Sequence, residues 1–262
     1  MSQPNWWPEA ANRLLGASQT LLALDFDGTL TPLVDDPEAA TTLPPCRAAL
    51  AVLAQAPTIS LALISGRPLR DLARLAKPPD QTLLAGSHGA ETGQIVGGQL
   101  QLEPHQLSAQ LQQRLASFDQ GLGQLIQAHG SPAGAWVEHK PTAHVLHTRL
   151  VADPALARDL SQAAWRLGAS LEAHVLEGKS VVELAVVPAG KAEALRQLRQ
   201  QTGASVVGFA GDDVTDELAL RTLSPPDVAI RVGNDPTTAE FTLADPDQVC
   251  AFLSYLATWR QS

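Results

Sequence analysis

The chain has 262 residues, 45% of them hydrophobic, which fits one large domain or two modest ones with a sizeable core. Its 27 Asp and Glu residues outnumber its 18 Lys and Arg residues, and the net charge of -9 argues against a surface that binds nucleic acid. The N-terminus lacks the features of a secretory signal, and no apolar run reaches the ~18 residues that span a bilayer. The presence of only two cysteines, Cys46 and Cys250, fits a reducing compartment. A single disulfide between them is the alternative that the sequence leaves undecided. We therefore expect a cytoplasmic protein that contacts neither membrane nor nucleic acid. We also expect it to be a monomer, although these features do not determine the oligomeric state.

Apolar runs alternate with helical periodicity in the two outer parts of the chain. The strand-like runs are 20–24, 59–64, 82–86 and 205–210, and helical spacing occurs at 44–55, 68–76, 190–201 and 214–222. Strands that alternate with helices predict an α/β fold with a parallel sheet. We expect this core to comprise residues 1–96 and 188–262.

Residues 97–187 show a different pattern. Their order is a glutamine-rich helical stretch (104–129), strand-like runs at 134–140 and 143–150, a helix at 153–167, and strand-like runs at 171–176 and 180–187. Two hairpin-like pairs with two helices predict an α+β module inserted into the α/β core.

Two carboxylates follow the first predicted strand directly. The segment LLALDFDGTLTPL (21–33) places Asp25 and Asp27 at the carboxyl end of that strand, where parallel sheets bind their ligands, and Gly28 lets the chain turn. Paired carboxylates repel each other, and a hard divalent cation relieves this repulsion. Asp25 could then attack a phosphorus atom, while Asp27 protonates the leaving oxygen and later activates water. The structural alternative is an Asx-turn that closes the strand.

Two further predicted element ends carry groups that bind anions. Ser65, in LALISGR, has a hydroxyl that can hydrogen-bond a phosphoryl oxygen. Lys191 begins a predicted helix, whose N-terminus also attracts anions. The alternatives are that Ser65 caps a helix beginning near Pro68 and that Lys191 is a solvated surface side chain.

Four acids follow the strand-like run at 205–210. The segment VVGFAGDDVTDELAL contains Asp212, Asp213, Asp216 and Glu217 within six residues. Such a cluster needs a cation or solvent. An acidic helix start, favoured by the helix dipole, is the alternative, and it explains Asp216 and Glu217 better than Asp212.

The order DxDGT, SGR, lysine and GDDxTDE resembles the four motifs of the haloacid dehalogenase superfamily of phosphohydrolases. The resemblance implies a doubly wound Rossmann-like core with a cap. It also implies that Asp25 is the nucleophile, that Asp27 is the general acid and base, and that Ser65 and Lys191 bind the phosphoryl group. It further implies a Mg²⁺ site formed by Asp25, Asp212 and the backbone carbonyl of Asp27.

Further segments resemble the trehalose-6-phosphate phosphatase family, and this resemblance covers roughly residues 20–258. GSHGAE (86–91), VEHK (137–140), HTR (147–149) and GKSVVEL (178–184) follow one another in the family's order. The resemblance implies a Mg²⁺-dependent phosphatase that hydrolyses trehalose 6-phosphate through an aspartyl-phosphate, with cap residues holding the disaccharide. The cap residues that carry over are Glu138, Lys140, His147, Arg149, Lys179 and Glu183.

Arg67 and His88 complete the expected substrate set. Arg67 closes the SGR segment, and His88 lies between glycines whose presence favours a close approach of the backbone to another group. Trp136, beside VEHK, is the tryptophan that we expect near a sugar. His147 and Arg149 alternate along a strand, so a solvent-facing role is their alternative.

Some positions depart from the family's pattern. In the HTR segment, Thr148 stands where the family has an aromatic residue, and this change removes a possible sugar-stacking surface. Ala192 follows the lysine where the family has glycine, and the preceding proline is closer to Lys191. None of these changes affects the four chemical groups.

Other functions are compatible with the same motifs. A phosphatase for a glucosyl- or mannosyl-glycerol or -glycerate phosphate would need only a different cap. A phosphomutase would use the same core. A phosphate-binding domain without turnover is disfavoured, because binding alone does not need a nucleophile beside Asp27, Lys191 and Asp212.

Overall fold

The computed structural model describes residues 4–103, 107–178, 180–187 and 190–259, and the chain divides into two compact units. One unit takes the described parts of 1–104 and 190–262, and the other takes those of 105–189. The first boundary lies later than the expected residue 97, because β5 (Gln99–Glu103) pairs with β4 (Glu91–Val96) in the sheet of the first unit.

The first unit is built on an eight-stranded sheet in the order β12-β11-β10-β1-β2-β3-β4-β5. Its parallel strands are β1 (Thr20–Leu24), β2 (Ile59–Ile64), β3 (Leu83–Gly86), β10 (Val206–Gly211), β11 (Val228–Val232) and β12 (Phe241–Leu243). The strands β4 and β5 continue the sheet in antiparallel pairing. This mostly parallel sheet confirms the predicted α/β class.

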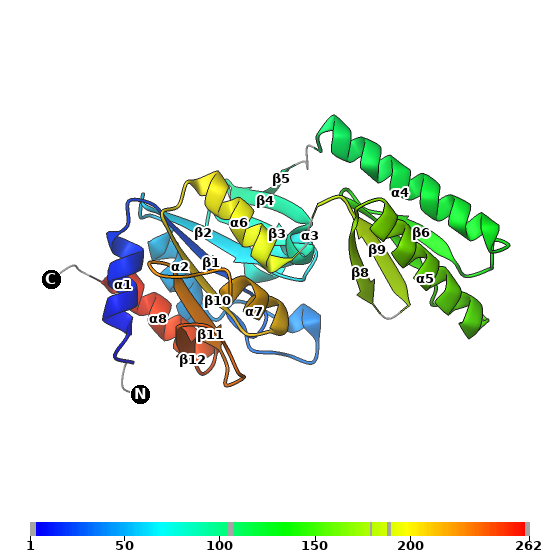
Figure 1. Ribbon diagram of the computed structural model, residues 1–262. Coiled ribbons are helices and arrows are strands. Elements are labelled where there is room, and N and C mark those ends of the chain that lie inside the picture. The colour runs from blue at the N-terminus through cyan, green and yellow to red at the C-terminus, as the bar shows by residue number, and fades with distance from the viewer. Residues whose placement is uncertain (1–3, 104–106, 179, 188–189, 260–262) are drawn as a thin grey trace. The chain divides into compact units, whose positions relative to one another are not determined.

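Helices cover both faces of this sheet (Figure 1). They are α1 (Trp7–Gly16), α2 (Pro44–Leu53), α3 (Leu69–Ala76), α6 (Lys191–Thr202), α7 (Val214–Leu220) and α8 (Pro246–Thr258). Along β1, Leu22 and Leu24 pack in the core formed with α1, α2, α3 and α8, whereas Leu21 and Ala23 pack in the core formed with α6 and α7. Burial on both faces explains why this strand is a continuous apolar run rather than an alternating one.

The two cysteines, for which the sequence leaves both states open, form a disulfide. Cys46 on α2 is joined to Cys250 on α8, and both residues are buried. These two helices also pack against each other. A disulfide does not favour a reducing compartment. The expected cytoplasmic location stays a prediction. No helix within the described residues has the length and apolar character needed to cross a membrane.

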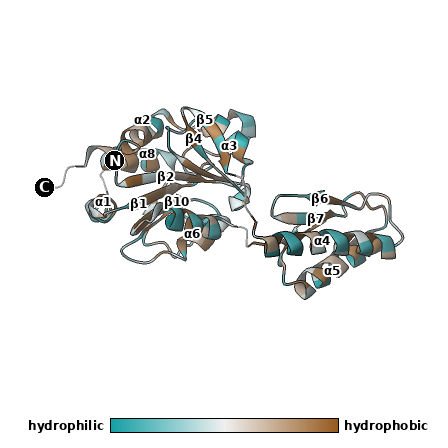
Figure 2. Ribbon diagram, turned by 90° about the horizontal axis from the view of Figure 1, so that it is seen from above, coloured by the Kyte–Doolittle hydropathy of each residue, from teal (hydrophilic) through white to brown (hydrophobic). Residues whose placement is uncertain are grey.

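The second unit contains a four-stranded antiparallel sheet in the order β6-β7-β9-β8. Its elements are α4 (Ala109–Ala128), β6 (Trp136–His139), β7 (Ala143–His147), α5 (Pro154–Ser170), β8 (His174–Gly178) and β9 (Val181–Ala185). Both helices lie on one side of this sheet (Figure 2). Phe118, Leu122, Leu146, Leu160 and Leu184 form the core between them. The α+β character of this part of the chain agrees with the prediction.

Candidate active site

A buried lysine and two buried aspartates meet at the carboxyl end of the core sheet. Asp25 follows β1, is 3% exposed, and donates its N–H to the Ala210 carbonyl at 2.9 Å. Lys191 is the first residue of α6 and is also 3% exposed. Its Nζ lies 2.8 Å from Asp25 Oδ1 and 2.7 Å from Asp216 Oδ1. Lys191 is therefore not the solvated side chain of the structural alternative.

Negative charge exceeds positive charge around this lysine. Asp25, Asp212 and Asp216 each place one carboxylate oxygen within 4.8 Å of the others. Burial raises the pKa of Asp25 to about 7, and burial together with repulsion from Asp25 raises the pKa of Asp216 to about 8. Burial and the neighbouring Asp216 raise the pKa of Asp212 to about 6. Burial opposes the charge on Lys191, but the carboxylates outweigh burial and raise its pKa.

The composition of this cluster fits a hard divalent cation. Three mutually repelling carboxylates share one ammonium, and a cation would neutralise the remaining charge. The donors are oxygens alone, which Mg²⁺ and Ca²⁺ prefer. Asp25 and Asp212 were expected at such a site, whereas the sequence left the contribution of Asp216 open.

Asp212 is positioned by a glycine of the opening motif. Gly28 has a positive φ of 74°, and a Cβ at this position would lie 2.0 Å from Asp212 Oδ2. The absence of a side chain thus lets the segment after β10 approach the segment after β1. Gly28 serves both the turn and this approach.

The other acids after β10 also begin a helix. Asp213 and Asp216 form a capping box at α7, with Asp213 Oδ1 accepting from the Asp216 N–H at 2.7 Å. Asp216 Oδ2 accepts the N–H groups of Asp212 and Asp213, each at 3.1 Å. Glu217 accepts hydrogen bonds from Thr238 and Thr237. The helix-start interpretation therefore accounts for part of this acidic run, and Asp216 has both a structural and an electrostatic position.

The two aspartates of the DxD motif have different partners. Asp27 receives a bidentate ion pair from Arg67, with Nε 2.6 Å from Oδ2 and Nη2 2.7 Å from Oδ1. Arg67 also donates to the Pro37 carbonyl at 2.9 Å. The carboxylate of Asp27 lies outside the group formed by Asp25, Asp212 and Asp216. Its predicted metal contact through the backbone carbonyl stays a prediction.

Ser65 lies beside these residues, at the end of β2. It is 2% exposed, and its Oγ accepts from the Arg67 N–H at 3.2 Å. The helix α3 begins at Leu69, with Pro68 as its N-cap and no capping side chain. Ser65 is therefore not the helix cap of the structural alternative, and its hydroxyl hydrogen is available for a further acceptor.

The backbone of His88 joins two loops of this region. Its N–H donates to the Ser65 carbonyl at 2.9 Å, and its carbonyl accepts from the Gly190 N–H at 2.8 Å. His88 has a positive φ of 56°. The neighbouring Gly86 is required for packing, since a Cβ there would lie 2.6 Å from the backbone nitrogen of Leu69. The sequence predicts that the backbone at these glycines approaches another group closely. At Gly86 that group is the backbone of Leu69 in the same chain.

In the second unit, several predicted substrate residues share the face of the sheet that the helices leave open. Trp136 pairs with His147 across β6 and β7, and Val145 of β7 lies between Glu138 of β6 and Glu183 of β9. Glu138 Oε2 lies 2.9 Å from His147 Nε2, and Glu183 Oε2 lies 2.7 Å from Lys140 Nζ. The ring of Trp136 stacks on the His147 imidazole at a centroid distance of 3.9 Å.

One other predicted substrate residue of this unit is described elsewhere in the structure, and a second is not described. Arg149 lines a separate hollow of about 520 Å³ beside α5, and Lys179 lies outside the described residues. Thr148 is buried, and its Oγ1 lies 3.3 Å from Ser161 Oγ on α5. The side chain at position 148 therefore faces α5 and lines the same hollow as Arg149. The loss of a sugar-stacking surface at this position stays a prediction.

Sequence reasoning missed Arg231. This residue is 3% exposed in β11, and its Nη1 donates to the Asp213 carbonyl at 2.6 Å. It thereby holds the start of α7 in place. The available signal was a single cation within the apolar strand VAIRV.

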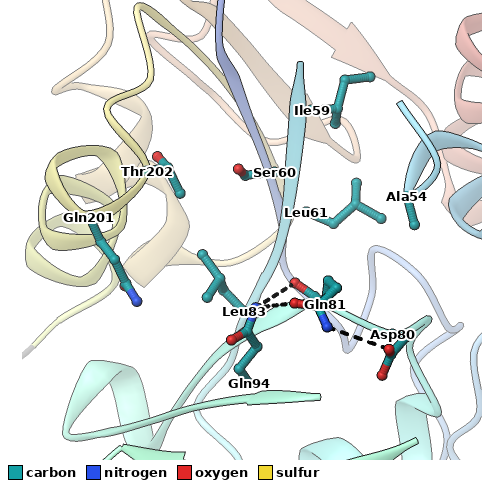
Figure 3. Close-up of a pocket in the computed structure, with 10 residues that line it drawn as sticks. All are labelled: Ala54, Ile59, Ser60, Leu61, Asp80, Gln81, Leu83, Gln94, Gln201 and Thr202. Atoms are coloured by element: carbon teal, nitrogen blue, oxygen red, sulfur yellow. Dashed lines mark hydrogen bonds between the residues drawn. The ribbon is translucent and has the colours of Figure 1, made fainter. Parts of the chain in front are cut away.

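A further hollow, of about 350 Å³, lies at the amino ends of β2 and β3, the opposite end of these strands from Ser65. Figure 3 shows Gln94 hydrogen-bonded to Gln81 on its wall, with Nε2 3.1 Å from Oε1. None of the predicted site residues lines this hollow.

The sequence matches the trehalose-phosphatase family over residues 23–247. The chain belongs to this family. Trehalose-phosphate phosphatase of Mycobacterium marinum is 33% identical over 246 residues, which cover 89% of this chain and 60% of that protein. An uncharacterized glycosyl hydrolase of Mycobacterium tuberculosis is 37% identical over 259 residues, which cover 94% of this chain and 19% of that protein.

The chain thus spans less than two thirds of the length of these two relatives. A solved structure of Aspergillus fumigatus trehalose-6-phosphate phosphatase aligns with a TM-score of 0.74 at 24% identity and covers 96% of this chain and 97% of its own. At this identity the match shows the shared trehalose-phosphatase fold.

Gly28→Ala tests the approach of Asp212 to the opening motif of this trehalose-phosphatase core. The new methyl group would displace the Asp212 carboxylate, so we expect the affinity of this acidic cluster for a divalent cation to fall at least about tenfold. Gly203→Ala is the matched control, because Gly203 also has a positive φ, of 65°, but a Cβ there would meet nothing within 4 Å. Calorimetric titration with Mg²⁺ measures both variants, and equal affinities would contradict this role of Gly28.

Proposed function

We propose that this chain is a Mg²⁺-dependent phosphatase that hydrolyses trehalose 6-phosphate to trehalose and phosphate. The observation that carries the proposal is the buried contact of Lys191 with Asp25 and Asp216, at the carboxyl end of the sheet. A carboxylate and an ammonium held together in this way can attack and bind one phosphoryl group. Membership of the trehalose-phosphatase family supports the choice of substrate.

In the proposed reaction, a carboxylate oxygen of Asp25 attacks phosphorus and the bond from phosphorus to the sugar oxygen breaks. Asp27 gives its proton to the leaving sugar oxygen. Asp27 then takes a proton from the water that attacks the aspartyl-phosphate, which releases phosphate and restores Asp25. Lys191 and Ser65 bind the phosphoryl oxygens through both steps.

Arg67 has a supporting position in this scheme. In the structure, two hydrogen bonds from Arg67 fix the orientation of the Asp27 carboxylate. One Asp27 oxygen has to leave Arg67 before it can carry the proton, because a bidentate pair with a guanidinium favours the ionised carboxylate. We propose this positioning role for Arg67 in addition to the substrate contact expected from the sequence. His88 stays a predicted substrate residue, and its backbone bonds hold the Ser65 loop beside the start of α6.

Mg²⁺ is the proposed metal because every candidate donor is a hard oxygen. Asp25, Asp212 and the carbonyl of Asp27 are the predicted ligands, and Asp216 is a further candidate from the geometry. When bound, the cation would supply positive charge to the phosphoryl oxygens and reduce repulsion between them and the acids.

The open face of the second unit is proposed to recognise the sugar. Glu138 and Glu183 can accept hydrogen bonds from hydroxyl groups, and His147 and Lys140 hold these carboxylates in place. The exposed ring of Trp136 offers an apolar surface against which a pyranose ring can pack. Arg149 and Lys179 stay predicted substrate residues. A small-molecule sugar phosphate is thus the proposed partner, and the chain is proposed to act as a monomer.

Asp25→Asn tests the nucleophile. The change removes the attacking charge and almost no volume, so we expect phosphate release from trehalose 6-phosphate to fall at least about 10³-fold. Asp247→Asn, an exposed position on α8, is the control and should keep full activity. A variant that keeps activity together with an unchanged circular dichroism spectrum would exclude Asp25 as the nucleophile.

The same assay identifies the substrate. A panel that includes glucosyl- and mannosyl-glycerate phosphates should show the highest kcat/KM for trehalose 6-phosphate. Preference for another compound, with the Asp25 effect intact, would reject the sugar and keep the chemistry. No phosphate release, together with isomerisation of a sugar phosphate that requires added sugar bisphosphate, would instead indicate a phosphomutase.

Removal of divalent cations tests the metal. We expect EDTA to stop phosphate release and Mg²⁺ to restore it, because three carboxylates then repel each other and the phosphate. Asp212→Asn should raise the Mg²⁺ concentration needed for half-maximal activity at least about tenfold. Activity that survives exhaustive chelation would contradict a metal-dependent site.

Glu183→Ala separates sugar recognition from phosphate chemistry. Each lost hydrogen bond to a charged group costs about 1.5–3 kcal/mol, so kcat/KM for trehalose 6-phosphate should fall about tenfold or more. Hydrolysis of an aryl phosphate, which has no sugar hydroxyls, should change little. Glu177→Ala is the matched control, because Glu177 pairs with Val182 and so lies on the other face of the same sheet. Equal losses on both substrates would mean that Glu183 supports the fold rather than the sugar.

A further inference from the structure

Three metal-ligating side chains meet in the second unit on the side of the sheet opposite Glu138 and Glu183. They are Asp119 on α4, His139 at the end of β6 and His144 on β7. One ligand atom of each lies within 4.8 Å of the others. Asp119 Oδ1 and His139 Nε2 are 2.7 Å apart. None of these residues has a part in the proposed phosphatase chemistry.

The local fold brings these residues together. Antiparallel pairing of β6 with β7 places His139 directly opposite His144. Residues two apart on a strand share a face, and Leu146 packs in the core beneath the helices, so His144 also faces the helices. The helix α4 packs on both strands and carries Asp119 next to the buried Phe118. Residues from three elements thus converge on one point.

His144 provides an independent reason to expect a ligand. The residue is 6% exposed, and its Nδ1 is a buried polar atom without a hydrogen-bond partner. Such atoms are rare in folded proteins because desolvation without a partner is costly. The His144 ring lies 4.6 Å from the His139 ring at an angle of 70°.

We propose that Asp119, His139 and His144 form a binding site for a borderline divalent cation such as Zn²⁺. Two imidazole nitrogens and one carboxylate oxygen are a donor set that zinc accepts with water as a fourth ligand. The same set is a poor one for Mg²⁺, which prefers oxygen donors. This chemistry distinguishes the site from the all-carboxylate cluster around Asp25.

Solvent has access to two of the three ligands. The side chain of His139 is 58% exposed and that of Asp119 is 54% exposed. A cation can therefore enter without unfolding the unit. Once bound, it would tie α4 to the β6–β7 hairpin, and β6 also carries Glu138 one residue before His139.

The test is Zn²⁺ binding to the full chain without an affinity tag, in excess Mg²⁺ so that the acid cluster of the first unit is occupied. Equilibrium dialysis should find one saturable Zn²⁺ per chain in this site. His139→Gln and Asp119→Asn should each lower the Zn²⁺ affinity at least about tenfold. Loss of a residue that only hydrogen-bonds to a metal ligand already has an effect of this size, and these two residues are proposed as ligands themselves. Both positions are exposed, so these variants should fold. Zn²⁺ should raise the thermal unfolding midpoint of the parent protein and not of either variant.

Two controls localise the effect. His174→Gln removes an exposed histidine of β8 that does not belong to the cluster, and it should leave Zn²⁺ affinity unchanged. Asp212→Asn should also leave it unchanged, because this residue belongs to the other acid cluster. The proposal is overturned if the parent protein shows no saturable Zn²⁺ binding, if His139→Gln and Asp119→Asn bind like the parent, or if His174→Gln loses as much affinity as they do. Because Zn²⁺ binding is measured directly, the result is independent of phosphatase activity.

Discussion

The ammonium group of Lys191 is the positive charge on which the core site depends. It lies between Asp25 and Asp216 at ion-pair distance, and all three side chains are buried. Buried carboxylates of this kind are tolerated only with a partner, and removing one member of such a set costs about 3–5 kcal/mol. Because Lys191 is the first residue of α6, the return of the chain from the second unit delivers this charge to the end of β1. The position at which the chain re-enters the first unit therefore also determines where the positive charge of the site lies.

The segment after β10 combines support of the fold with chemistry. Asp213 and Asp216 cap α7 while Asp216 also faces Lys191, and Arg231 holds the same turn from β11. A carboxylate that accepts two backbone N–H groups cannot rotate freely, so the position of its second oxygen beside Lys191 is fixed. Stability of the helix start and placement of charge at the site thus depend on the same bonds.

The parts of this structure that local pattern determines were predictable from sequence. The strands β1, β2 and β10 are apolar runs that polar residues follow directly, and parallel packing places the carboxyl ends of these strands at the same edge of the sheet. By contrast, β5 reads QLQLE, a polar edge strand that is recognisable only through its pairing with β4. The Arg67–Asp27 pair joins positions 40 residues apart, and the facing of Thr148 towards α5 depends on tertiary packing. The cluster of Asp119, His139 and His144 likewise exists only once α4 lies across the hairpin.

The disulfide between Cys46 and Cys250 has a consequence for the covalent connectivity of the molecule. The loop that it closes contains the whole second unit, because residues 105–189 lie between the two cysteines in the chain. A single backbone cut within residues 107–178 would separate the half that carries Asp25 and Ser65 from the half that carries Lys191 and Asp212. The sulfur–sulfur bond would keep these halves in one molecule until a reductant is added. Proteolytic nicking of the inserted unit would thus leave the strands that hold the core acids covalently joined.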